Sequence, residues 1–140
     1  FKTLNDTHGH EAGDLLLLEV TGRLKDCVRQ VDTVARFGGD EFVVLLAELN
    51  ADQAESRSHA QSIAEKIRAA LAEAYVLAPH KDGKAAATIE HRCSASIGVV
   101  MFRGHEASQD DILKWADAAM YRAKDAGRNT IRFYAGDGQP

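Results

Sequence analysis

The chain has 140 residues, which suits one domain built around one hydrophobic core. Its composition, 45% hydrophobic and 27% charged, is that of a globular protein, and no apolar run is long enough to cross a bilayer. The net charge of −4 argues against a partner that is a nucleic acid polymer, because such binding needs a basic face.

The first half of the chain is predicted to contain a helix, a hairpin and a second helix. Apolar residues recur at helical spacing over residues 14–31. Residues 34–46 form two apolar runs separated by Gly38 and Gly39, which indicates a β-hairpin. Residues 51–76 again repeat apolar positions every three or four residues, so we expect a long helix there.

The second half is predicted to alternate strands with one helix. Residues 79–87 form a polar loop, and residues 88–102 form one long strand or a hairpin arm. Ser108 is placed to cap the helix that follows, and Gly127 is placed to end it. Residues 129–135 have the composition of a closing strand.

This order predicts an α+β sandwich, with one mostly antiparallel sheet and helices on its faces. It lacks one strand at its start for a ferredoxin-like pattern. The opening letters FKTLND therefore suggest the tail of a truncated segment, and we expect residues 1–140 to be one domain that is incomplete at its N-terminus.

Two adjacent acids, Asp40 and Glu41, follow the glycine pair at the tip of the hairpin. Because glycine has no Cβ atom, a bulky ligand can approach the backbone of Gly38 and Gly39 closely. A rigid turn that carries carboxylates is suited to hold a hard cation such as Mg²⁺. The hairpin alone is equally compatible with an ordinary solvated turn.

Four blocks together resemble one known family. RFGGDEF resembles the signature of the GGDEF family, the diguanylate cyclases, and FKTLNDTHGHEAGD resembles the segment that follows the first strand of that family. SASIGVV resembles its central strand, and ADAAMYRAKDAGRN resembles its last helix and turn. The blocks cover nearly the whole chain in the order of the family, which implies a palm-like α+β fold.

The resemblance implies that two GTP molecules are condensed into cyclic di-GMP with release of two pyrophosphates. Asp40 matches the metal-binding acid and general base of the family, and Glu41 matches the second acid. The metal implied is Mg²⁺, with Mn²⁺ as a substitute. The reaction joins two GTP molecules in one symmetric product, so we expect two domains to form a homodimer, at least transiently.

Asn5 and Asp14 match the guanine-binding residues of the family, and His10 matches a nearby position. A carboxylate can accept hydrogen bonds from guanine N1–H and N2–H together, whereas adenine has an acceptor at N1. Other readings are open for both residues. Asp14 also suits the first turn of a helix, and Asn5 also suits a turn or cap.

Basic residues near both ends of the chain match phosphate contacts of the family. Lys124 and Arg128 correspond to triphosphate ligands, and Lys2 lies in the matching Phe-Lys segment. Arg29 and Asp32 match its R-x-x-D inhibitory site, where Arg29 would grip phosphate or guanine and Asp32 would accept from a guanine edge. The alternative for Lys124 and Arg128 is a solvated helix end, and the alternative for Arg29 and Asp32 is a surface ion pair at a helix end.

The family carries a metal-binding aspartate a few residues before Phe-Lys, whereas this sequence begins at Phe1. We therefore expect the fragment to turn over poorly. The resemblance also implies a sensory or receiver domain upstream, in a parent protein that could be anchored to a membrane. Cys27 and Cys93 lie in apolar patterns, which indicates buried free thiols and a cytoplasmic domain.

Two other functions are compatible with these residues. The first is an inactive GGDEF module that senses cyclic di-GMP or GTP, although such modules usually lose the acids retained here. The second is another palm-like nucleotidyl cyclase that makes a different product, because Asn5 and Asp14 favour guanine but do not fix the second substrate.

Overall fold

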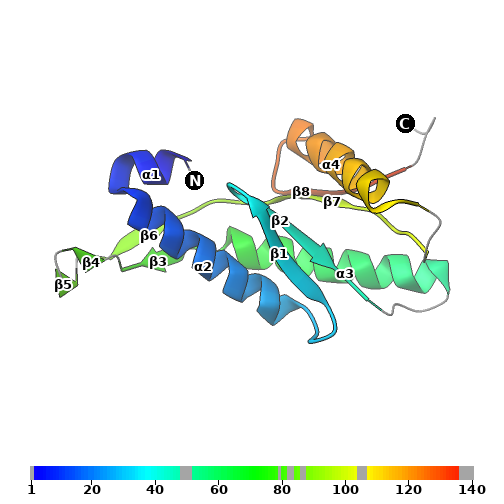
Figure 1. The fold of residues 1–140 in the computed structure, drawn as a ribbon, viewed down its shortest axis with the longest axis horizontal. Helices are drawn as coiled ribbons and strands as arrows, with labels where there is room; N and C mark the ends of the chain where they lie inside the picture. The colour runs from blue at the N-terminus through cyan, green and yellow to red at the C-terminus, as the bar shows by residue number, and fades with distance from the viewer. Residues whose placement is uncertain are drawn as a thin grey trace. The chain divides into compact units, whose positions relative to one another are not determined.

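The computed structural model describes the chain except for Phe1 and six short internal or terminal segments. The described residues are 2–47, 52–78, 80–81, 84–85, 88–103 and 107–135. They divide into two compact units, which are described in turn. Figure 1 shows their helices and strands in the order of the chain.

The first unit comprises residues 1–49 and 73–93. Its elements are α1 (Lys2–His8), α2 (His10–Cys27), β1 (Thr33–Gly38), β2 (Glu41–Leu45), β3 (Tyr75–Leu77), β4 (His80–Lys81), β5 (Lys84–Ala85) and β6 (Ile89–His91). The strands form three antiparallel pairs, β1 with β2, β3 with β6, and β4 with β5.

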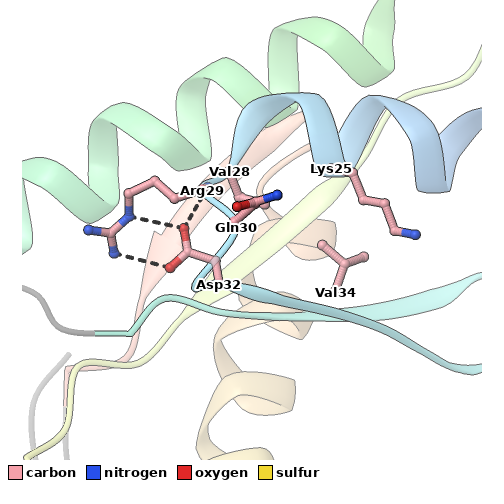
Figure 2. Close-up of a pocket in the computed structure, with 6 residues that line it drawn as sticks. All are labelled: Lys25, Val28, Arg29, Gln30, Asp32 and Val34. Atoms are coloured by element: carbon pink, nitrogen blue, oxygen red, sulfur yellow. Dashed lines mark hydrogen bonds and ion pairs between the residues drawn. The ribbon is translucent and has the colours of Figure 1, made fainter.

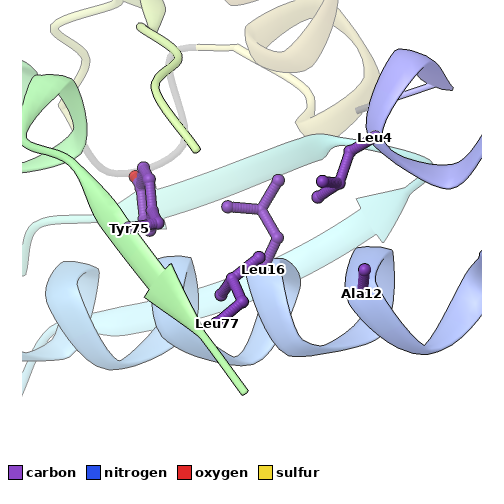
Figure 3. Close-up of a cluster of buried hydrophobic side chains, with 5 residues drawn as sticks. All are labelled: Leu4, Ala12, Leu16, Tyr75 and Leu77. Carbon is purple, nitrogen blue, oxygen red and sulfur yellow. The ribbon is translucent and has the colours of Figure 1, made fainter. Parts of the chain in front are cut away.

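The core of this unit joins the first two helices to β3, as Figure 3 shows. Its buried side chains are Leu4, Ala12, Leu16, Tyr75 and Leu77. Arg23 of α2 covers the ring of Tyr75, with its guanidinium carbon 3.7 Å from the ring centroid. The same guanidinium donates hydrogen bonds to the backbone oxygens of Glu73 and Ala74, at 2.9 and 2.8 Å. These contacts fix the start of β3 against α2.

The second unit comprises residues 50–72 and 94–140. Its elements are α3 (Gln53–Ala72), β7 (Ser96–Val99), α4 (Gln109–Asp125) and β8 (Thr130–Phe133). β7 and β8 pair in parallel, with Ser96 opposite Thr130, and α4 packs on both strands. The ring of Trp115 in α4 stacks on the ring of Tyr134, with centroids 5.3 Å apart.

The predicted α+β class is confirmed, and most of the predicted elements are present. The hairpin spans β1 and β2, and the closing strand is β8. The hydroxyl of Ser108 accepts a hydrogen bond from the backbone N–H of Asp111 at 3.1 Å, as a cap should. In the described residues the predicted single sheet takes the form of four two-stranded pairs.

None of the described helices combines the length and the apolar character needed to cross a bilayer.

The helix predicted over residues 14–31 has different bounds. The structure begins a helix already at Lys2 and breaks it at Gly9, where φ is +88°, before α2 starts at His10. A positive φ interrupts a right-handed helix, and glycine adopts it without strain. α2 ends at Cys27 because Val28 is extended, with φ −122° and ψ 168°.

The segment after α3 also differs from the prediction. The helix predicted to reach residue 76 ends at Ala72, because buried Tyr75 and Leu77 alternate with exposed Val76 in strand fashion. The predicted polar loop contains the short pair β4 and β5, and the predicted long strand is divided into β6 and β7. Of the two free cysteines, Cys27 is buried and Cys93 is half-buried.

Candidate functional site

The tip of the β1–β2 hairpin presents two carboxylates on a constrained backbone. Gly38 and Gly39 have φ values of +150° and +49°, which side chains disfavour. The strand register is irregular between Arg36 and Gly38, as in a β-bulge. Arg36 Nε donates a 2.9 Å hydrogen bond to the backbone oxygen of Gly39 and so closes the turn. Asp40 and Glu41 are both exposed there.

These acids form a donor set that suits Mg²⁺. Among the described residues no three acidic, histidine or cysteine side chains cluster as a complete metal cage. Mg²⁺ does not need one at a nucleotide site, since it is bound by one or two carboxylates together with substrate phosphates and water. Asp40 and Glu41 supply hard oxygen ligands of that kind on a fixed turn.

The corner between α1 and α2 brings the two predicted guanine-binding residues together. Asn5 lies in α1 and Asp14 lies in the second turn of α2, directly after a glycine that the Asn5 side chain contacts. Asn5 is half-buried, whereas Asp14 and His10 are exposed. Asn5 is therefore a helix residue rather than a turn or cap. Its backbone oxygen accepts a 2.8 Å hydrogen bond from Gly9 N–H at the corner.

The residues that are predicted to contact phosphate lie at two helix ends. Lys124 is exposed in the last turn of α4, and Arg128 is exposed just beyond it. Gly127, Arg128 and Asn129 all have positive φ, of 107°, 62° and 48°. Such backbone costs energy at residues other than glycine and recurs at functional sites. Lys2 is the first residue of α1, and its side chain lies outside the described part of the structure.

Arg29 and Asp32 line a pocket of about 270 Å³ that lies between the end of α2 and the start of β1 (Figure 2). The other residues that line it are Lys25, Val28, Gln30 and Val34. The side chain of Asp32 has no exposed surface, and it forms an ion pair of 3.1 Å with Arg29. Arg29 also donates a hydrogen bond to the backbone oxygen of Ala47.

Asp32 also closes the base of the hairpin. One carboxylate oxygen accepts a 3.0 Å hydrogen bond from the backbone N–H of Ala47, two residues beyond β2. The other accepts a 2.8 Å bond from the backbone N–H of Arg29. In this arrangement both oxygens of Asp32 are engaged within the protein. A guanine edge would have to displace one of these bonds to reach the carboxylate.

The environment of Asp32 predicts acid-dependent stability. Burial raises the pKa of Asp32, but the hydrogen bonds from Arg29 and Ala47 outweigh it, so the pKa lies below its ordinary value. The stabilisation is therefore complete above the unfolded pKa of about 4 and is lost as the pH falls through the folded pKa. Chemical denaturation between pH 7 and pH 2 should show Asp32→Asn converging with the unaltered chain at low pH. The control variant Asp26→Asn replaces an exposed acid of α2. Its free energy of unfolding should change with pH in the same way as that of the unaltered chain.

Three contributors to these sites had no role in the sequence-based prediction. Arg36 closes the acidic turn, Lys25 lines the pocket, and Ala47 binds Asp32 through its backbone. The spacing of Lys25 four residues before Arg29 would place both on one face of the helix predicted over residues 14–31, but the structure ends α2 at Cys27 and leaves Arg29 outside it. No sequence signal marks a backbone partner such as Ala47.

Comparison with known proteins decides the family. The family described as "Diguanylate cyclase, GGDEF domain" matches residues 1–130. The chain belongs to the GGDEF family. This GGDEF domain is 41% identical over 134 residues to the bifunctional diguanylate cyclase/cyclic di-GMP phosphodiesterase MucR of Pseudomonas aeruginosa, covering 96% of the chain and 17% of MucR. It thus spans less than a fifth of that relative.

Solved structures agree with this assignment. The crystal structure of the GGDEF domain of YfiN (TpbB) from Pseudomonas aeruginosa superposes with a TM-score of 0.74 at 35% identity, covering 97% of this chain and 76% of that chain. The GGDEF domain of DgcB from Caulobacter crescentus, solved in complex with c-di-GMP, gives a TM-score of 0.67 at 25% identity, covering 96% and 72%.

Proposed function

We propose that this GGDEF domain is the catalytic domain of a diguanylate cyclase that condenses two GTP molecules into cyclic di-GMP. The observation that carries the proposal is the Asp40–Glu41 pair, which is intact, exposed and mounted on a turn closed by Arg36. Cyclase relatives of the family supply the reaction class. The remaining site residues supply binding and charge.

In the proposed reaction, the 3′-hydroxyl oxygen of each GTP forms a bond to the α-phosphorus of the other, so that two bonds close the ring. The bond between that phosphorus and the bridging oxygen breaks, and pyrophosphate leaves with the electron pair. Asp40 accepts the hydroxyl proton, and Glu41 stands beside it as a second acid. Mg²⁺, or Mn²⁺ in its place, would be held by Asp40 and Glu41 with the phosphates and would neutralise developing negative charge.

Base and phosphate recognition are assigned to separate parts of the chain. Asn5 and Asp14 are proposed to bind guanine, with His10 nearby. Lys124, Arg128 and Lys2 are proposed to bind the triphosphate, where cations offset its charge. Because the product has two equivalent halves, two copies of the domain are proposed to meet around a two-fold axis.

The proposal is tested by identifying products. The full-length gene product is incubated with GTP, with ATP, and with their mixture in the presence of Mg²⁺, and the products are identified by mass spectrometry. We expect cyclic di-GMP and pyrophosphate from GTP in a ratio of one to two. Binding of GTP or cyclic di-GMP without turnover would instead show a sensor module, and a mixed product would show a different nucleotidyl cyclase.

The Arg29 pocket is proposed to bind the product and slow the enzyme. Its support is the pocket of about 270 Å³, which has Arg29 and Lys25 among its lining residues. Both groups are cations that can bind the phosphates of cyclic di-GMP. The DgcB domain, which was solved with c-di-GMP, shows that a related GGDEF domain binds this nucleotide.

Arg29→Ala is expected to raise the cyclic di-GMP concentration needed for half-inhibition by about tenfold or more, since one charge-assisted contact is lost. The initial rate should stay unchanged. The measurement is pyrophosphate release at increasing product concentration. Arg92→Ala, which removes an exposed arginine paired with Glu90, is the matched control. Arg29→Gln replaces the first variant if loss of the Asp32 partner unfolds the chain. Unchanged inhibition in either folded variant would contradict the role of this pocket.

A further inference from the structure

Gly13 occupies a position where the backbone does not call for glycine. It is the fourth residue of α2, it is buried, and its φ is not among the positive values of the chain. Glycine inside a helix is less favourable than alanine, because it loses more conformational freedom on folding. The residue must therefore be explained by what surrounds it.

The space that a side chain would need at Gly13 is filled by Asn5. A Cβ atom added at Gly13 would lie 1.8 Å from Asn5 Oδ1, 2.7 Å from Cγ and 3.0 Å from Nδ2. The whole carboxamide group therefore rests on the bare backbone of α2. Gly22 of the same helix has no such neighbour, since nothing lies within 4 Å of its added Cβ.

Packing against Gly13 is what holds the carboxamide in place. Asn5 Oδ1 is buried and has no hydrogen-bond partner in the described part of the chain. A buried polar atom without a partner is unfavourable for folding. This position of Asn5 is therefore not explained by stability. It does place the carboxamide against the residue next to Asp14.

We propose that Gly13 is a positioning residue for guanine recognition, which acts by leaving room for the Asn5 carboxamide beside Asp14. The inference rests on the proposed function, in which Asn5 and Asp14 bind the base. Alanine at position 13 would force the Asn5 side chain to rotate away. Because that side chain is flexible and unpartnered, the fold would tolerate the change while base binding would not.

The test compares Gly13→Ala with the matched control Gly22→Ala in the full-length gene product. Both should melt at or above the temperature of the unaltered protein, since alanine favours a helix. Gly13→Ala should raise the Michaelis constant for GTP about tenfold, the equivalent of one lost hydrogen bond, and leave kcat within about twofold. Gly22→Ala should leave both constants unchanged. Equal kinetics for the two variants would overturn the inference.

A double-mutant cycle separates this role from a general structural one. In an Asn5→Ala background no carboxamide remains to be displaced, so adding Gly13→Ala should have no further effect on the Michaelis constant. If Gly13→Ala raised the Michaelis constant in this background as much as it does alone, the inference would be overturned. If Gly13→Ala alone does not fold, two proteins decide the test. Asn5→Ala must raise the Michaelis constant for GTP, and the double variant must have the same Michaelis constant as Asn5→Ala.

The two levels of inference fail in different ways. If the unaltered protein makes no cyclic di-GMP, the proposed function fails. The same variants are then compared by their dissociation constants for GTP, measured by calorimetry, and the tenfold difference should persist. A protein that does not bind GTP at all would overturn both.

Discussion

Asp40→Asn is expected to reduce cyclic di-GMP formation by roughly a thousandfold or more while the fold remains intact. The substitution keeps the size of the side chain but removes the negative charge and the proton acceptor. General base catalysis alone contributes about 10²–10⁴-fold, and loss of a metal ligand adds to this. The side chain is exposed on the turn, so no buried contact is lost.

The measurement is pyrophosphate release from GTP and Mg²⁺ by the full-length gene product, with a thermal melt of each variant. Asp117→Asn is the control, since Asp117 is an exposed acid of α4 with no assigned role. It should retain the unaltered rate. Asp40→Asn activity within tenfold of that rate would remove the hairpin acid from the proposed mechanism.

Gly98→Ala is expected to have the largest effect on stability. A Cβ at this position in β7 would lie 2.3 Å from the backbone oxygen of Ala116 and 2.4 Å from the backbone nitrogen of Met120. Both atoms belong to the backbone of α4, which cannot rotate away as a side chain can. Overpacking of this kind costs about 1–3 kcal/mol or more, and we expect the upper part of that range.

Denaturant unfolding and a thermal melt measure this cost. Roughly 3 kcal/mol corresponds to a melting temperature lower by about 10 °C in a chain of this size. Gly22→Ala is again the control, because its added Cβ meets nothing within 4 Å. A Gly98→Ala protein as stable as that control would mean that α4 can move off β7 at little cost.

Features marked by local chemistry could be predicted from the sequence. The glycine pair between apolar runs identified the hairpin, and Ser108 identified the start of α4 through its own hydroxyl. The acidic turn was recognisable for the same reason, since Asp40 and Glu41 directly follow Gly38 and Gly39. In each case the residues that determine the structure are neighbours in the chain.

Features that depend on distant backbone atoms could not be predicted. The sequence is compatible with a surface acid at position 32, whereas the Asp32 side chain has no exposed surface and accepts a hydrogen bond from the backbone of Ala47. The first helix was missed because residues 2–8 are mostly polar, and Leu4, which is buried there, gives no periodicity by itself. Gly13 lies in a block that resembles the family, but the sequence does not show that the Asn5 side chain fills the space beside it.

The stacking of Trp115 on Tyr134 gives the second unit an optical label of its own. Trp115 is the only tryptophan in the chain, and both rings of the stack belong to residues 94–140. Fluorescence emission excited at the red edge of indole absorption therefore reports on the surroundings of α4 and β8. Far-ultraviolet circular dichroism reports on helices of both units, so the two signals together distinguish concerted from stepwise melting of the chain.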